Sequence, residues 1–371
     1  MKTARQAEAQ RLQQKGLSRA EAAKAMGLKL SGYCSLLERA AKWDDAPSAL
    51  TNGAQVIGAD TPANIVWTKT HKDGSTTHSV MHSNKPEPPD PEEYAEAMVE
   101  RFKDIPPAPA VHLKESPVKD TMALFIVADW HLGASSTKEE TGNAYNRKIA
   151  VERLRDGFST CHAATAPSEF GIVLFNGDTT DADNDKRETP RSGHKLMVEG
   201  SHQSNLLLAE ESADWSVQMA LERHEKVIFS AKRGNHDPHT PPTLIAGMRA
   251  RYADNPRVTV IEDEEPFFMF QHKKLFFVSH HGDGQKPEKM AETIKFKYRR
   301  EWGRSDYHFF CTSHLHHSKA DTFGGMRWRQ TPAVCAIGQH GNQMAFADTG
   351  GMLSMWFDTV NGRWSEFEVR L

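Results

Sequence analysis

The sequence has few cysteines, no long apolar run and no strong excess of either charge. Only four cysteines occur among 371 residues, at Cys34, Cys161, Cys311 and Cys335, without a CxxC pair. This excludes a disulfide scaffold, and we interpret all four as packing residues. The absence of an 18-residue apolar run and of an apolar leader predicts a cytoplasmic protein that does not bind membranes. A net charge of -3 excludes a general polycation, so any nucleic-acid binding must be local.

What is present first is a basic, helical N-terminal segment, residues 1–43, with nine Lys or Arg against three Glu. Ser18 and Glu21 form a capping box for a first helix that Gly27 ends, and a second helix is expected over residues 31–41. Two short helices with a tight turn favour a helix-turn-helix. Its second helix would point four DNA contacts outward from its N-terminal end, namely Lys29, Ser31, Tyr33 and Ser35. A helical hairpin that binds protein is the alternative.

Residues 44–119 are interpreted as a linker between this segment and a main domain over residues 120–371. Alternating runs on either side of Asp73 and Gly74 predict a β-hairpin over about residues 64–82. An acidic helix is expected over about residues 91–103, between proline-rich connectors that act as semi-rigid spacers.

Five short apolar runs in the main domain each end in Asp, Asn or His. They are MALFIVADWH, GIVLFNGDTTD, KVIFSAKRGNHD, KLFFVSHHGD and YHFFCTSHLHH. Each run is too short and too rich in β-branched or aromatic residues for a helix, and the helical patterns between them are typical of crossovers in an α/β sheet. Because ligand crevices lie beyond the carboxyl ends of such strands, we expect the side chains there to converge: Asp129, His131, Asp178, Asn235, His236, His281, His314 and His316.

This mixture of imidazole, carboxylate and amide groups suits Mn²⁺, Fe²⁺ or Zn²⁺ better than Ca²⁺. The set is too large for one ion, and a carboxylate can bridge two. The pattern therefore predicts two divalent ions, with Mn²⁺ as first choice and Fe²⁺, Zn²⁺ or Mg²⁺ as alternatives, which activate a shared hydroxide for in-line attack on a phosphoryl group.

The ordered motifs DWH, GDTTD, GNHD, HGD and SHLH resemble the calcineurin-like metallophosphoesterases, whose pattern is DxH, GDxxD, GNH(D/E), a lone His and GHxH. The resemblance covers residues 120–371 and implies a four-layer αββα sandwich of the α/β (α+β) class, preceded here by the helical module and the hairpin. The runs AVCAIG, MLSMWFDT and WSEFEVRL that follow are expected as antiparallel strands of the second sheet.

The resemblance also implies roles for individual residues. Ligands of the first ion would be Asp129, His131 and His316, those of the second Asn235, His281 and His314, with Asp178 bridging the two. His236 would contact the phosphate and protonate the leaving oxygen, and Asp181 would orient its ring and keep it charged. Adjacent His280 is an alternative to His281. Ser313 departs from the usual Gly of the last motif, and Ala182 replaces the Arg that follows in protein Ser/Thr phosphatases, which argues against a phosphoprotein substrate.

Two basic clusters suggest where a substrate binds. One lies on the loop after GDTTD, and the other, just before the last histidines, is interleaved with Phe296, Tyr298 and Trp302. Basic groups beside aromatic rings are typical of single-stranded nucleic-acid channels, although a solvated amphipathic helix explains the second cluster as well. The substrate-binding candidates are Arg187, Arg191, Lys195, Arg299 and Arg300.

A helix-turn-helix tethered to such a domain would raise the local concentration of DNA. The arrangement is similar to phage-encoded phosphoesterases with the same domain order, and the motifs are similar to those of SbcD-type DNA repair nucleases. We therefore expect a DNA phosphodiesterase that works as an exonuclease, in the host cytoplasm if the protein is phage-encoded. The alternatives are a phosphomonoesterase or a phosphodiesterase for nucleotides or cyclic nucleotides, and a non-catalytic DNA-binding or assembly protein. Association into a homo-oligomer is compatible with the sequence.

Overall fold

The structure is a computed structural model that describes residues 8–9, 11–12, 15, 18–28, 33–34, 37, 65–70, 76–81, 105–184, 186–190, 193–336, 338 and 350–371. The chain divides into two compact units, Met1–Asp90 and Pro91–Leu371. None of the helices within the described ranges is long and apolar enough to span a membrane.

In the first unit, the capped helix is confirmed as α2 (Arg19–Ala25). The Ser18 hydroxyl accepts from the backbone N–H of Glu21, whose side chain accepts from the Ser18 backbone. Gly27, with φ of 64°, follows the helix end. The expected outward orientation of Tyr33 is wrong, because its ring is buried against Ala9, Ala22 and Ala23 and its hydroxyl donates to the Ala9 carbonyl at 2.8 Å.

The other three proposed DNA contacts, Lys29, Ser31 and Ser35, lie outside the described residues, as does the expected acidic helix over residues 91–103. The expected hairpin is present as β1 (Ile65–Thr70) and β2 (Thr76–Met81), which pair antiparallel.

The second unit contains two sheets. Six strands lie in the order β13 (Trp364–Arg370), β12 (Gly351–Asp358), β3 (Val118–Val127), β4 (Ser168–Asn176), β5 (His224–Lys232) and β6 (Val258–Val260). Strands β3 to β6 are parallel, and β12 is antiparallel to both neighbours. The second sheet has the order β10 (Lys319–Phe323), β11 (Met326–Gln330), β9 (Tyr307–Thr312), β8 (Leu275–His280) and β7 (Phe267–His272), in which β11, β9 and β8 are parallel.

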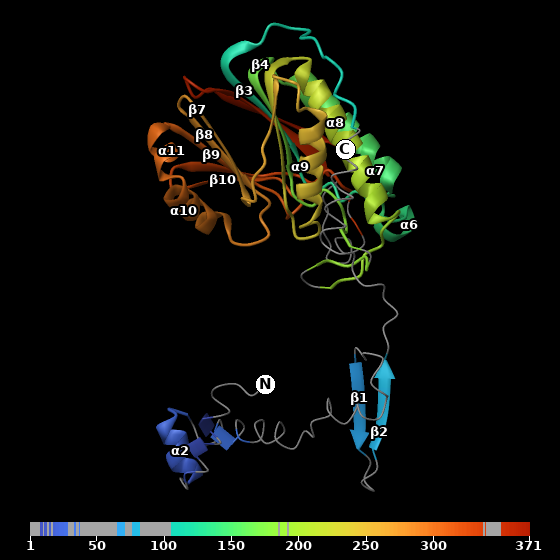
Figure 1. Cartoon of the computed structure of the whole chain (residues 1–371). Helices are drawn as coiled ribbons and strands as arrows, with labels where there is room; N and C mark the ends of the chain where they lie inside the picture. The colour runs from blue at the N-terminus through green and yellow to red at the C-terminus, as the bar shows by residue number, and fades with distance from the viewer. Residues whose placement is uncertain are drawn as a thin grey trace. The chain divides into compact units, whose positions relative to one another are not determined.

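Helices cover the outer face of each sheet, which gives the four layers expected from the sequence (Figure 1). The larger sheet carries α7 (Arg147–Ala164), α8 (His202–Leu221) and α9 (Thr240–Arg251), with the short α6 (Lys138–Thr141) before them. The smaller sheet carries α10 (Pro287–Lys297) and α11 (Arg299–Arg304).

Strand β3 shows how the sequence builds these layers. Its residues alternate: Leu124 and Ile126 point into the core between the sheets, whereas Phe125 and Val127 point into the core under α7 to α9. Because successive side chains of a strand face opposite sides, a continuous apolar run is needed to fill both cores.

Two expectations about the C-terminal strands are corrected. Strands β12 and β13 join the larger sheet beside β3, not the second sheet. The run AVCAIG is no strand in its described residues: its backbone binds a loop instead, since Val334 N–H donates to the Ala128 carbonyl and Cys335 N–H to that of Asp129.

Candidate metal centre

Loops at the carboxyl ends of β3, β4, β5, β8 and β9 carry all seven predicted metal ligands. Eight described non-glycine residues have φ between 47° and 74°, and five of them are predicted ligands: Asp129, His131, Asp178, His314 and His316. Side chains other than glycine rarely adopt this left-handed conformation, which costs on the order of 1–3 kcal/mol each and persists at functional sites. Backbone strain is thus concentrated where the side chains converge.

Asp178 lies at the centre of the group and is 1% exposed. Its Oδ2 atom is 3.7 Å from Nε2 of His131 on one side and 3.3 Å from Nε2 of His281 on the other. A carboxylate in this position can contact ions on both sides, as a bridging ligand must.

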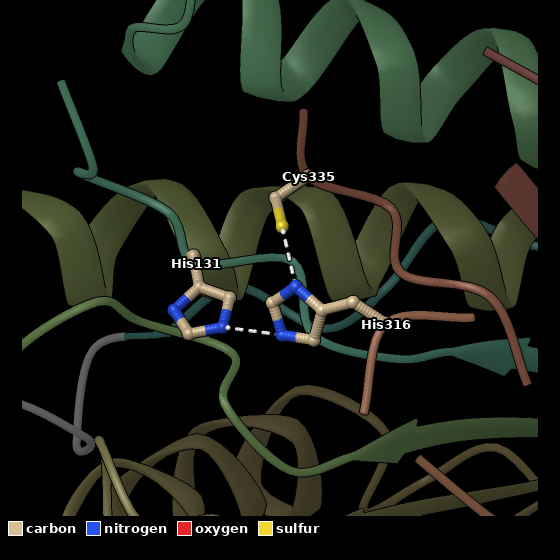
Figure 2. Close-up of side chains that lie close together, drawn as sticks. All are labelled: His131, His316 and Cys335. Atoms are coloured by element: carbon tan, nitrogen blue, oxygen red, sulfur yellow. Dashed lines mark hydrogen bonds between the residues drawn. The ribbon is translucent and has the colours of Figure 1, made fainter. Parts of the chain in front are cut away.

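The first predicted set lies on one side of Asp178. The Nε2 atoms of His131 and His316 are 3.3 Å apart, and Nε2 of His316 is 3.5 Å from Oδ1 of the fully buried Asp129 (Figure 2). The Nδ1–H of His131 donates to Asp181 Oδ1 at 3.0 Å. This bond fixes the tautomer that leaves Nε2 free as a ligand atom, as in carboxylate–histidine–metal arrangements.

The second set lies on the other side. Nε2 of His281 is 3.2 Å from Oδ1 of Asn235, while its Nδ1–H donates to the Asn176 carbonyl at 3.0 Å. A ligand atom of His314 lies within 4.8 Å of those of Asp178 and His281, and the His314 backbone N–H donates to Asp129. His280 is turned away, since its Nδ1 accepts from the Gly282 backbone. The geometry therefore favours His281 over His280.

These donors fit divalent ions. Ligand atoms bound to one ion at about 2.1 Å are about 3.0–3.4 Å apart. The distances from His131 Nε2 to His316 Nε2 (3.3 Å), from His281 Nε2 to Asp178 (3.3 Å) and from His281 Nε2 to Asn235 (3.2 Å) fall within this spacing. Those from His316 Nε2 to Asp129 (3.5 Å) and from His131 Nε2 to Asp178 (3.7 Å) lie beyond it. A Cβ added to Gly234 would lie 2.0 Å from Asp178 Oδ1, so the GNHD loop needs glycine there to approach the carboxylate.

Electrostatics around the centre favour positive charge. Burial lowers the pKa of His131, but its bond to Asp181 and nearby anionic groups outweigh burial and raise the pKa to about 9. Burial likewise opposes the effect of Asp178 and Asp129 on His281, whose pKa is raised to about 10. Burial also raises the pKa of Asp178, yet His281 and His131 bring it well below its usual range. A field that holds protons on buried imidazoles also attracts metal cations.

His236 lies at the edge of the centre, and its backbone N–H donates to Asp178 Oδ1 at 2.8 Å. The expected role of Asp181 is corrected in part. The Nδ1–H of His236 donates to the backbone carbonyl of Asp181 at 2.8 Å, while the Asp181 carboxylate is 3.5 Å away and bonds His131. Burial and then His131 lower the pKa of His236, whereas Asp178 and Asp181 raise it.

Asp237 was not recognised from the sequence as part of the site, although it is the last residue of GNHD. It is fully buried, and its carboxylate accepts from four backbone N–H groups, those of Asp178, Thr179, Thr180 and Gly234, at 2.7–3.2 Å. It therefore joins the loop after β4 to the loop after β5.

Ser313, which departs from the family pattern, is also buried. Its hydroxyl accepts from Asn176 Nδ2 at 2.6 Å and lies 3.1 Å from the Thr331 hydroxyl. Asn176 in turn accepts from Ser279 at 2.9 Å. A side chain in place of glycine thus ties the end of β9 to β4 and β8.

Cys335 is a second residue that was not recognised from the sequence as part of the site. Its sulfur is 3.7 Å from Nδ1 of His316, whereas the other ring nitrogen, Nε2, faces His131 (Figure 2). Ligand atoms of His131, His316 and Cys335 all lie within 4.8 Å of one another. Cys335 lies 19 positions after His316, within the apolar run AVCAIG. Nothing in that run indicated a residue of the metal centre.

The predicted substrate-binding residues lie in different places. Arg187 and Lys195 are exposed on a loop that packs along the loop after His131, through Glu199 N–H to Gly133 O at 2.7 Å. Lys195 is paired with Glu188 at 2.8 Å, and Arg187 donates to the Gly200 carbonyl. Arg191 lies outside the described residues.

Arg299 and Arg300 are not brought to the centre. They belong to α11, which leads into the start of β9, and the six residues of β9 span roughly 20 Å before His314 is reached. Tyr298 and Trp302 pack against the outer face of the smaller sheet, and Trp302 stacks on His308 at 3.6 Å between ring centroids. The amphipathic-helix alternative therefore describes this cluster, and the channel hypothesis for it is not kept.

No family model and no curated protein matches the chain. Among solved structures, an archaeal phosphodiesterase is similar over 67% of this chain and 100% of its own, with 13% identity and a TM-score of 0.35. A predicted phosphoesterase from Streptococcus pneumoniae (13% identity, 67% and 98% coverage, TM-score 0.28) and Vps29 with Zn²⁺ from Entamoeba histolytica (12% identity, 67% and 99% coverage, TM-score 0.28) are also similar. Identities and TM-scores this low carry no argument about activity, and the chemistry of the site follows from its side chains.

Proposed function

We propose that the chain is a divalent-metal-dependent phosphodiesterase that acts on DNA as an exonuclease. The observation that supports this most is the convergence around Asp178 of two carboxylates, one amide and four imidazoles from five strand ends. The fold alone would not distinguish enzyme from scaffold, because function depends on the site.

When bound, two divalent ions would activate a water molecule and neutralise phosphoryl oxygens during in-line displacement. Asp129, His131 and His316 would hold one ion and Asn235, His281 and His314 the other, with Asp178 in contact with both. The backbone bond to Asp178 holds His236 at the edge of the centre. Its ring would contact the phosphoryl group or the leaving oxygen.

Exposed cations beside the centre support an extended anionic substrate. Arg233, two residues before Asn235, is exposed. Burial lowers the pKa of His280 at the end of β8, and the charges of His281 and Arg233 add to this effect. Arg187 is exposed on the loop that packs along the His131 loop. In the first unit Lys15, Arg19 and Lys24 are exposed, which suits a basic module tethered to a nuclease.

The test uses the whole chain with Mn²⁺ and end-labelled single- and double-stranded DNA. Progressive shortening from an end is expected, and Asp178→Asn should lose metal and cleavage together. Asp254→Asn, which removes the same charge at an exposed position, serves as the control.

Bis-p-nitrophenyl phosphate separates the alternatives. If the artificial ester and nucleoside monophosphates are hydrolysed but no DNA is cut, the protein is a small-molecule phosphoesterase. If the ester stays intact at full metal occupancy, the protein is a non-catalytic scaffold.

A further inference from the structure

Four histidines of the centre have Nδ1 contacts with the protein. In three of them the partner is an oxygen: Asp181 Oδ1 for His131, the Asp181 carbonyl for His236 and the Asn176 carbonyl for His281, at 2.8–3.0 Å. An oxygen of this kind can only accept, so in the neutral ring each bond places the proton on Nδ1 and leaves the lone pair on Nε2. For His131 and His281, Nε2 faces Asp178.

In His316 the same position is taken by sulfur. Cys335 Sγ lies 3.7 Å from Nδ1, while Nε2 of the same ring faces His131 at 3.3 Å and Asp129 at 3.5 Å (Figure 2). Within the described residues, this sulfur is the Nδ1 contact that the structure gives for His316. The two nitrogens of an imidazole point in different directions, so the atom at Nδ1 and an ion held by Nε2 occupy different positions around the ring.

The sulfur is held firmly in place. Cys335 is 6% exposed, and its backbone N–H donates to the carbonyl of Asp129 at 3.1 Å. Arg153 on α7 donates to the carbonyls of Val334 at 2.8 Å and of Cys335 at 3.3 Å. The segment that carries the thiol is thus anchored both to a ligand loop and to the helical layer.

We propose that Cys335 is a positioning residue of the metal centre: its sulfur accepts the Nδ1–H of His316 and so directs Nε2 toward the first ion. Sulfur is a weaker acceptor than the oxygens that hold the other rings. His316 is also half-buried where His131 and His281 are buried. This inference rests on the metal centre proposed above.

The test measures metal binding to apoprotein by calorimetric titration with Mn²⁺, for the wild type, Cys335→Ala, Cys335→Ser and Cys161→Ala. Loss of such a partner lowers metal affinity about 10- to 100-fold, so Cys335→Ala should weaken one of two binding steps by that factor and leave the other unchanged. Cys335→Ser keeps an acceptor and should bind more tightly than Cys335→Ala. Cys161→Ala removes a buried thiol in α7 and should bind both ions like the wild type.

Cobalt substitution distinguishes positioning from direct ligation. The wild-type Co²⁺ form should show no thiolate-to-metal charge-transfer band, and a band that disappears in Cys335→Ala would overturn the proposal by placing sulfur on the ion. Equal titrations of wild type and Cys335→Ala, with unchanged thermal unfolding of both apoproteins, would also overturn it. A wild-type chain that binds no metal would instead refute the proposed function.

Discussion

The Oδ1 atom of Asp237 lies 3.1 Å from the backbone nitrogen of Asp178. The fully buried carboxylate of Asp237 therefore lies beside that of Asp178, and the two like charges repel each other. Four backbone N–H donors around Asp237 compensate for this arrangement and join the loop after β4 to the loop after β5.

We expect Asp237→Asn to lower the free energy of unfolding by about 2–4 kcal/mol, because the amide turns donor hydrogens toward backbone N–H groups and leaves buried donors unpaired. Urea unfolding of the apoprotein measures this. The free energy of unfolding of Asp254→Asn, at an exposed position, should stay close to that of the wild type. An equal decrease in both variants would contradict the stabilising role of the four backbone bonds to Asp237.

His236→Ala should reduce turnover of bis-p-nitrophenyl phosphate by about 10²- to 10⁴-fold, since the substitution removes a group that contacts the reacting phosphate. Metal content should be unchanged, because the bond to Asp178 comes from the backbone of residue 236. Kinetics with metal analysis tests both parts, and His239→Ala, an exposed histidine three residues on, is the control. Loss of metal in His236→Ala would mean that the ring is a ligand.

Arg233→Gln should weaken DNA binding and leave hydrolysis of the artificial ester close to normal. If Arg233 contacts a phosphate, the slope of log affinity against log salt should become shallower by about one. Fluorescence anisotropy with labelled DNA at several salt concentrations provides the measurement. Arg304 is an exposed arginine at the end of α11, before the start of β9, and Arg304→Gln should keep the wild-type slope.

The protein should lose stability in acid because of a buried histidine pair remote from the centre. Nδ1 of His224 accepts from the Ser168 backbone at 3.1 Å, so a proton there would replace an acceptor with a second donor. Burial, followed by the charges of His162 and Arg223, lowers the pKa of His224 to about 3. Burial and Arg223 lower that of His162 to about 4.

In the unfolded chain both imidazoles titrate near 6.5. Below this pH the two imidazoles bind protons in the unfolded state but stay neutral in the folded state. The free energy of unfolding therefore falls as pH drops from about 6.5 toward 4. The slope is about 1.4 kcal/mol per pH unit for each histidine. Urea unfolding of apoprotein between these values should show the fall, and His224→Gln should make it shallower while His317→Gln, at an exposed position, leaves it unchanged.

Much of the site was predictable because its residues follow strands directly. Asp129, Asp178 and His281 each come within two residues of an apolar run, and parallel strands bring such positions to one edge. The four layers were expected from the resemblance to the calcineurin-like metallophosphoesterases, and the apolar runs explain them, since a strand that is apolar on both faces must be covered on both faces.

Other features depend on contacts that linear order does not encode. Arg299 and Arg300 stand 15 and 14 positions before His314, and the whole of β9 separates them in space. Tyr33 was assigned to the outer face of a helix, but the face that packs is decided by partners such as Ala9, distant in sequence. Cys335 meets His316 because its run forms a loop on Asp129 where alternation suggested a strand.

Adjacent side chains of strand β3 pack in two different cores, Leu124 in one and Phe125 in the other. Asp129 follows two residues after the end of the strand. One inserted residue within the strand would exchange every apolar contact between the two cores and turn the following carboxylate to the wrong side of the sheet. From Met122 to Asp129 the length of this segment is therefore under the same chemical constraint as the identity of any ligand.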